Sequence, residues 1–191
     1  MNYFTDQERI KSMYLVSLYF DEETERILQK YIKRTAEKTG NFYMLEHQIL
    51  PHLTIAACNS KRERELIAAL DACAGLWHAG SIDWAGVGSF KPRVLFLLPV
   101  LSLYLHELCV SANAAAERAG RNVGEGINRY RPFGWIPHTT IARTLSEKQM
   151  LAGFHILQAD FTPFTGKGTR IGLARSNPYQ DIKVWELPEK E

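Results

Sequence analysis

The segments PHLTIAA (residues 51–57) and PHTTIAR (residues 137–143) repeat the pattern Pro-His-X-Thr-Ile-Ala within one chain of 191 residues. Each is a short run rich in Thr and Ile that a proline opens, which is typical of a β-strand. The two copies lie in different halves of the chain. The repeat therefore predicts two related strands, one from each half.

Strand geometry places the polar side chains of each motif on one surface. Because side chains alternate along a strand, His52 and Thr54 point to one face, and His138 and Thr140 likewise share a face. If two lobes bring these surfaces together across a cleft, two imidazoles and two hydroxyls meet in one small volume.

Such a site suits cleavage at phosphorus. A neutral imidazole takes a proton from the attacking hydroxyl or water, while an imidazolium opposite protonates the leaving oxygen. Threonine hydroxyls donate hydrogen bonds to the non-bridging phosphate oxygens. This chemistry needs no metal and no cofactor.

A single Pro-His-X-Thr-Ile strand is most often structural, but two copies in the same register favour a shared site.

The segments around the motifs alternate between strand and helix patterns. In the first half we expect a strand at 13–20, helices at 21–40 and 62–76, and strands in SIDWAGVGSF and RVLFLLPV. Acidic residues crowd the first turn of the helix at 21–40, and Gly40 stops it.

The second half repeats this order more loosely. We expect helices at 103–120 and 146–157, with Ser146 as the cap of the second helix. TRIGLARS and DIKVWELP are predicted to form two strands of a hairpin, joined through Asn177-Pro178-Tyr179. Each half thus holds strands, helices and one motif, so we expect the halves to be lobes of a single domain spanning residues 1–191.

Composition excludes several classes of protein. With 46% hydrophobic residues and a net charge of +2, the chain is globular and too weakly basic to coat nucleic acid. Cys58, Cys73 and Cys109 lie far apart, which favours a reducing cytoplasm over a disulfide framework. The N-terminus lacks a signal-peptide pattern, and the most apolar run, at 94–105, is too short for a membrane span. We therefore expect a soluble cytoplasmic protein.

At these residues the chain resembles the 2H phosphoesterase superfamily, which is named for two His-X-Thr or Ser motifs. Within it, the chain is most similar to the 2′-5′ RNA ligase-like group, also called RNA 2′,3′-cyclic phosphodiesterases. The resemblance rests on the early strand and helix, on His52-Leu53-Thr54-Ile55, on residues 90–95 and on residues 138–143. It implies an α+β fold of two pseudo-twofold-related lobes, each with an antiparallel sheet and outer helices, and a cleft between them.

The resemblance also implies a function. Members open 2′,3′-cyclic phosphates to 2′-phosphates without metal, and some join RNA ends reversibly through a 2′-5′ linkage. We therefore expect RNA or a nucleotide with a cyclic phosphate as partner, no cofactor, and a monomer.

Further residues are candidates for binding the substrate. Arg143 lies three residues beyond Thr140, so alternation alone points it away from the histidines unless the strand twists or ends there. The family often has Arg at this place, which favours a role at the phosphate or in the structure. Phe90, Lys91 and Arg93 combine cations and an aromatic ring suited to phosphate and base, although a surface turn explains them nearly as well.

The connection before the second motif is basic, aromatic and rich in glycine. We expect it to form either a flap over the cleft or a packed loop. Its basic and aromatic residues are Arg121, Arg129, Tyr130, Arg131, Phe133 and Trp135. Its glycines lack the Gly-Lys-Ser/Thr ending of a phosphate loop. The remaining histidines are expected to be structural or exposed: His47, His78, His106 and His155.

Other functions remain alternatives at this point. The same fold serves a phosphodiesterase acting on 2′-5′ oligonucleotides or on RNA 3′ ends. A non-catalytic RNA-binding module would not need a His–Thr pair in each half, and the chain lacks an RNP1-like run. A metallohydrolase using His52 and His138 lacks partner ligands at suitable spacing. A nucleotide-dependent ligase would need a Lys-X-Asp-Gly sequence, which is absent.

Overall fold

The computed structural model describes residues 13–60, 62–90, 93–119, 130–176 and 179–190. The first strand and helix have the predicted bounds to within a residue: β1 spans Met13–Phe20 and α1 spans Glu22–Thr39. The carboxylate of Asp21 caps α1 by accepting a hydrogen bond from the backbone N–H of Thr24. Gly40, with φ of +68°, ends the helix in the left-handed conformation that glycine adopts readily.

The later elements follow the predicted order. They are α2 (Tyr43–Glu46), β2 (Leu53–Asn59), α3 (Glu63–Ala74), β3 (Gly80–Phe90), β4 (Val94–Pro99), α4 (Leu103–Ala119), β5 (Thr139–Ala142), α5 (Glu147–Asp160), β6 (Phe164–Ser176) and β7 (Tyr179–Glu186). Ser146 caps α5 through a capping box with Gln149. The short helix α2 was not predicted. The predicted turn residues Asn177 and Pro178 lie outside the described residues.

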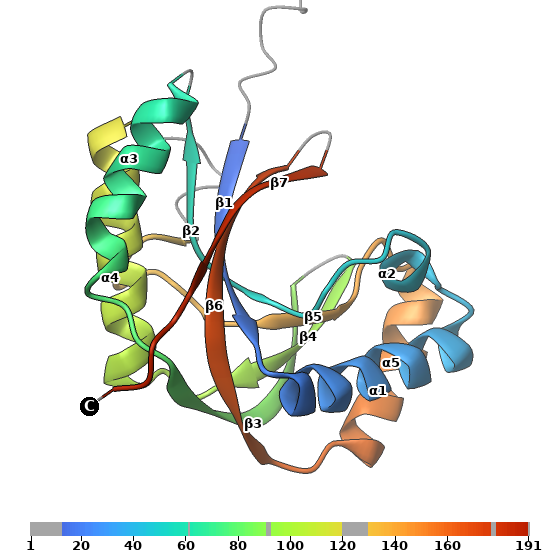
Figure 1. Ribbon diagram of the computed structural model, residues 1–191. Coiled ribbons are helices and arrows are strands. Elements are labelled where there is room, and N and C mark those ends of the chain that lie inside the picture. Colours follow the sequence, from blue (N-terminus) through green and yellow to red (C-terminus); the bar gives the residue numbers. More distant parts are fainter. Residues whose placement is uncertain (1–12, 61, 91–92, 120–129, 177–178, 191) are drawn as a thin grey trace, which may run out of the picture.

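The described residues form a seven-stranded sheet in which all strand pairs are antiparallel. Its strands lie in the order β1-β2-β5-β4-β3-β6-β7, and β1 also pairs with β6. The first six strands therefore close into a circuit, with β7 continuing alongside β6 (Figure 1). The mixed α and β architecture with antiparallel strands and outer helices agrees with the predicted fold class.

Two helix layers cover the sheet, and each combines elements of both sequence halves. On one side α3 packs against α4, and α4 packs on β2. On the other side α1 packs against α5, and the two cover β3, β4 and β5 (Figure 1). The expectation that each half of the sequence forms its own lobe is therefore wrong, because α1 covers the strand of the second motif and α4 covers that of the first.

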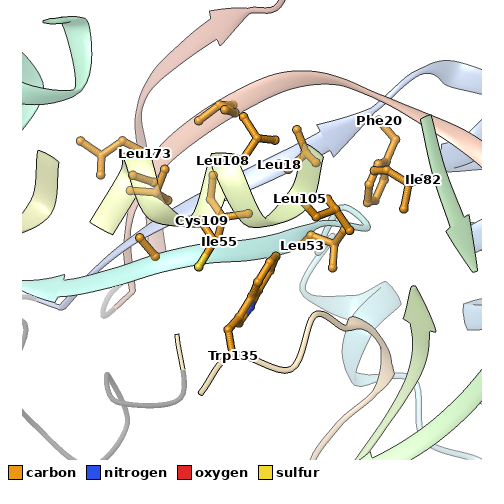
Figure 2. Close-up of a cluster of buried hydrophobic side chains, with 14 of the residues drawn as sticks. Leu18, Phe20, Leu53, Ile55, Ile82, Leu105, Leu108, Cys109, Trp135 and Leu173 are labelled. Carbon is orange, nitrogen blue, oxygen red and sulfur yellow. The ribbon is translucent and has the colours of Figure 1, made fainter. Parts of the chain in front are cut away.

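The core lies between the helices and the sheet. Val16, Leu18 and Phe20 of β1 are fully buried, and Leu53 and Ile55 of β2 are buried beside them. Figure 2 shows these strands meeting side chains of α4 and the indole of Trp135. In the part of the chain that the structure describes, no helix is both long and apolar enough to cross a membrane.

Candidate active site

The two motifs lie side by side on neighbouring strands. Leu53 of β2 pairs with Thr139 of β5 in antiparallel register. In this register His52 stands opposite Thr140, and Thr54 stands opposite His138. The structure thus brings the four predicted residues together on one face, with each histidine opposite the other motif's threonine.

Each histidine is oriented by the same backbone contact. The Nδ1 atom of His52 lies 2.8 Å from the carbonyl oxygen of Leu50, and the Nδ1 atom of His138 lies 2.8 Å from that of Ile136. Because a carbonyl oxygen only accepts hydrogen bonds, Nδ1 carries the hydrogen in both rings. In the neutral imidazole Nε2 is then the basic nitrogen, and in the imidazolium it is a donor.

The threonines of the motifs follow the expected alternation. The Thr54 hydroxyl is buried and lies 3.5 Å from that of Ser17 on β1. Thr140 is half-buried on the same face. Thr139 points the other way into the core, where its hydroxyl accepts a hydrogen bond of 3.2 Å from the indole of Trp84.

Aromatic rings surround His138. Its ring centroid lies 4.8 Å from that of Phe90 in an edge-to-face contact, 5.3 Å from that of Phe96 and 6.3 Å from that of Tyr130. Burial lowers the pKa of His138, and the positive charge of His52 lowers it further. The charge of His52 thus reaches the imidazole of His138. Phe90, a predicted site residue, is thus in direct contact with His138.

His52 has a more polar environment. The ring of Tyr19 lies 6.0 Å from its imidazole. Burial is the main cause that lowers the pKa of His52, and the charge of Arg143 adds to it, whereas the backbone bond to Leu50 and the charge of Asp181 oppose it. Both histidines thus favour the neutral form more than a free imidazole does.

The two predicted arginines have different surroundings. β5 ends at Ala142, so strand alternation no longer applies to Arg143, and its guanidinium lies near enough to lower the pKa of His52. Arg93 instead lines a cavity of about 920 Å³ with side chains of α5 such as Met150 and Phe154. In β4 itself, Leu95 approaches α5, whereas Phe96 packs against His138. Lys91 lies outside the described residues.

Sequence reasoning did not predict the contacts that join the two motifs. The indole Nε1 of Trp135 donates a 3.1 Å hydrogen bond to the carbonyl of Thr54, so the segment before the second motif is tied to the first. The amide nitrogen of the buried Asn113 lies 3.1 Å from the carbonyl oxygen of Ile55 and 2.8 Å from that of Tyr130. These contacts span large sequence separations, and no local pattern signals them.

The predicted aromatic connection is described only from residue 130 onward, so Arg121 and Arg129 lie outside the described residues. Trp135 is buried, whereas Phe133 is exposed beside His106 of α4. Of the other histidines, His47 stacks on Tyr43, His78 stacks on Tyr104, and His155 lines the cavity at α5. Over the described ranges, no three His, Cys, Asp or Glu side chains gather closely enough to hold a metal ion.

The chain belongs to the 2′-5′ RNA ligase superfamily, whose family model matches residues 24–179. Members of this superfamily are phosphoesterases, and the predicted resemblance is confirmed at this level. A comparison with curated proteins finds no match.

Several solved structures share the fold. A crystal structure described as a phosphoesterase is 18% identical, with a TM-score of 0.63, over 93% of this chain and 99% of the other. TT0787 of Thermus thermophilus is 18% identical, with a TM-score of 0.61, over 94% of this chain and 100% of the other. E. coli LigT in complex with NADP⁺ is 17% identical, with a TM-score of 0.59, over 94% of this chain and 99% of the other.

Proposed function

We propose that this protein is a phosphodiesterase that opens 2′,3′-cyclic phosphates of RNA ends or nucleotides to 2′-phosphates. The observation that carries the proposal is the matched pair of motifs, in which His52 and His138 are oriented alike and each faces the other motif's threonine. Membership of the 2′-5′ RNA ligase superfamily supports the class of substrate. E. coli LigT, which has the same fold, binds 3′-AMP, ATP and phosphate.

The reaction follows from the two Nε2 atoms. One neutral imidazole takes a proton from water, whose oxygen forms a bond to phosphorus in line with the P–O3′ bond. As that bond breaks, the other imidazole, in its charged form, gives its Nε2 proton to O3′. Thr54 and Thr140 donate hydrogen bonds to the non-bridging oxygens, where negative charge increases. If the 5′-hydroxyl of a second RNA replaces water, the same steps form a 2′-5′ linkage.

A panel of substrates tests the proposal against its alternatives. The panel contains 2′,3′-cyclic nucleotides, oligonucleotides ending in a cyclic phosphate, 2′-5′ oligonucleotides and RNA with a free 3′ end. We expect turnover of the cyclic phosphates, with the product phosphate on the 2′ oxygen. Turnover of only the last two substrates would favour the alternative phosphodiesterases. RNA binding without turnover of any substrate would indicate a binding module.

A chelator is expected to leave the activity intact. Two imidazoles and two hydroxyls already supply proton transfer and charge stabilisation, so the proposed reaction has no step for a metal. Turnover of a 2′,3′-cyclic nucleotide should be equal before and after prolonged dialysis against EDTA. Loss of activity that a divalent ion restores would contradict this mechanism.

The pH dependence of kcat/KM is expected to be bell-shaped, with its maximum below pH 6.5. The rate rises with pH as the base loses its proton and falls as the acid loses its own. Because the pKa values of both His52 and His138 are lowered from the ordinary value of 6.5, both limbs shift to lower pH. The two apparent pKa values belong to the coupled pair. Two limbs that both lie above 6.5 would contradict this expectation.

A further inference from the structure

An aromatic ring from α2 supports Arg143. The guanidinium carbon of Arg143 lies 5.4 Å from the ring centroid of Tyr43, in a cation–π contact. The imidazole of His47 stacks on the same ring, with centroids 4.1 Å apart and planes inclined by 19°. The Nδ1 atom of His47 also donates a 2.9 Å hydrogen bond to the carbonyl oxygen of Tyr43. The contacts with His47 therefore fix the ring of Tyr43 in the short helix α2, which precedes the first motif in the sequence.

Among the described residues, the position of Arg143 leaves its side chain with few other contacts to order it. It is exposed, it follows the last residue of β5, and the next residue, Thr144, has a left-handed backbone with φ of +61°. Within the described part of the chain, no carboxylate forms an ion pair with it. A long exposed side chain without an ion pair loses much rotamer entropy when it is ordered. A contact that already orders the side chain in the free protein reduces the entropy that is lost when a ligand binds.

We propose that Tyr43, backed by His47, is a positioning residue that holds the guanidinium of Arg143 beside His52, ready to meet the phosphate. This inference rests on the proposed function, because it assigns the group that Tyr43 positions to the same substrate. Tyr43 itself does not touch the reacting atoms in this arrangement. It links the segment before the first motif to the residue that follows the second.

The surroundings of His52 support this placement. Arg143 follows β5, the strand that pairs with the first motif, and its charge lowers the pKa of His52. The other groups near His52 are Tyr19 on β1, Asp181 on β7 and His138 before β5, all on elements other than α2, which carries Tyr43. A change at Tyr43 can therefore reach His52 through Arg143.

The titration of the His52 imidazole, followed by NMR, tests the inference without any substrate. In Arg143→Gln the pKa of His52 should rise toward its ordinary value, because a positive charge is removed. Tyr43→Leu keeps an apolar side chain but removes the aromatic face, so it should shift this pKa in the same direction. Tyr43→Phe keeps the face and should titrate like the wild type. An unchanged pKa of His52 in Tyr43→Leu, beside a shifted one in Arg143→Gln, would overturn the inference.

Steady-state kinetics on a 2′,3′-cyclic nucleotide gives a second, independent readout. We expect Tyr43→Leu to raise KM about 2- to 30-fold, the range of a cation–π contact, with a smaller change in kcat. In the double variant Arg143→Gln/Tyr43→Leu, KM should be little higher than in Arg143→Gln alone. If the double variant instead loses the full product of both single effects, Tyr43 does not act through Arg143. If the wild type turns over no cyclic phosphate, the proposed function fails, and the titration alone still decides the role of Tyr43.

Discussion

Replacing either motif histidine with alanine is expected to lower kcat on a 2′,3′-cyclic nucleotide about 10²–10⁴-fold, the usual contribution of a positioned proton donor or acceptor. Each variant removes one of the two Nε2 atoms that the backbone contacts orient. In the double variant His52→Ala/His138→Ala, the loss should be smaller than the product of the single losses, because residues that act in one step are not additive. The measurement is kcat and KM for all three variants.

One control variant and one threonine variant separate the role of the imidazoles from other effects. His155→Ala removes an imidazole that lines the cavity at α5 and should leave turnover unchanged. Thr54→Val keeps the shape of a motif side chain but removes its hydroxyl, so it should lose less rate than the histidine variants. Circular dichroism and thermal unfolding establish that each variant folds. Near-normal turnover in either single histidine variant would rule out the paired acid–base mechanism.

Trp135→Ala is expected to lower the free energy of unfolding by about 3–5 kcal/mol, as for other buried aromatic side chains. The indole is buried among side chains of the core, and its Nε1 holds the carbonyl of Thr54. Trp135→Phe keeps most of the ring and loses the hydrogen bond, which contributes about 0.5–1.5 kcal/mol. Chemical denaturation measures both values.

Trp77 offers a matched control for this change. It is also buried, and its indole donates a hydrogen bond to Ser111, but it packs against Trp185 away from the motifs. Trp77→Ala should therefore destabilise the protein to a similar extent without altering kcat/KM of the folded fraction. Trp135→Ala should lower kcat/KM as well, because it releases the second motif from the first. Equal kinetic effects of the two variants would show that Trp135 acts only on stability.

Local patterns predicted the elements and the polar face of the motifs. The bounds of β1 and α1 follow from a run of apolar residues and from the cap residues Asp21 and Gly40, which act within a few positions. The shared face of His52 and Thr54 follows from strand alternation alone. The repeat predicted that the two motifs share one site, but not that Leu53 pairs with Thr139 on neighbouring strands.

The remaining features depend on contacts between distant segments. Arg93 lies beside α5 in the cavity that this helix lines, and Arg143 lies just beyond the end of β5, in contact with Tyr43. Neither the bond from Trp135 to Thr54 nor the exchange of helices between the two halves has a local signal. Propensity and periodicity describe neighbours along the chain, so they do not predict these features.

The closure of β1 against β6 has a consequence for how the protein is made. β1 has β2 as one partner, but its second edge pairs with residues 168–175, near the other end of the chain. During synthesis on the ribosome this edge stays unpaired until β6 has emerged. Such non-local pairing slows folding. The strand that supports the first motif thus reaches its final environment only when almost the whole chain is available.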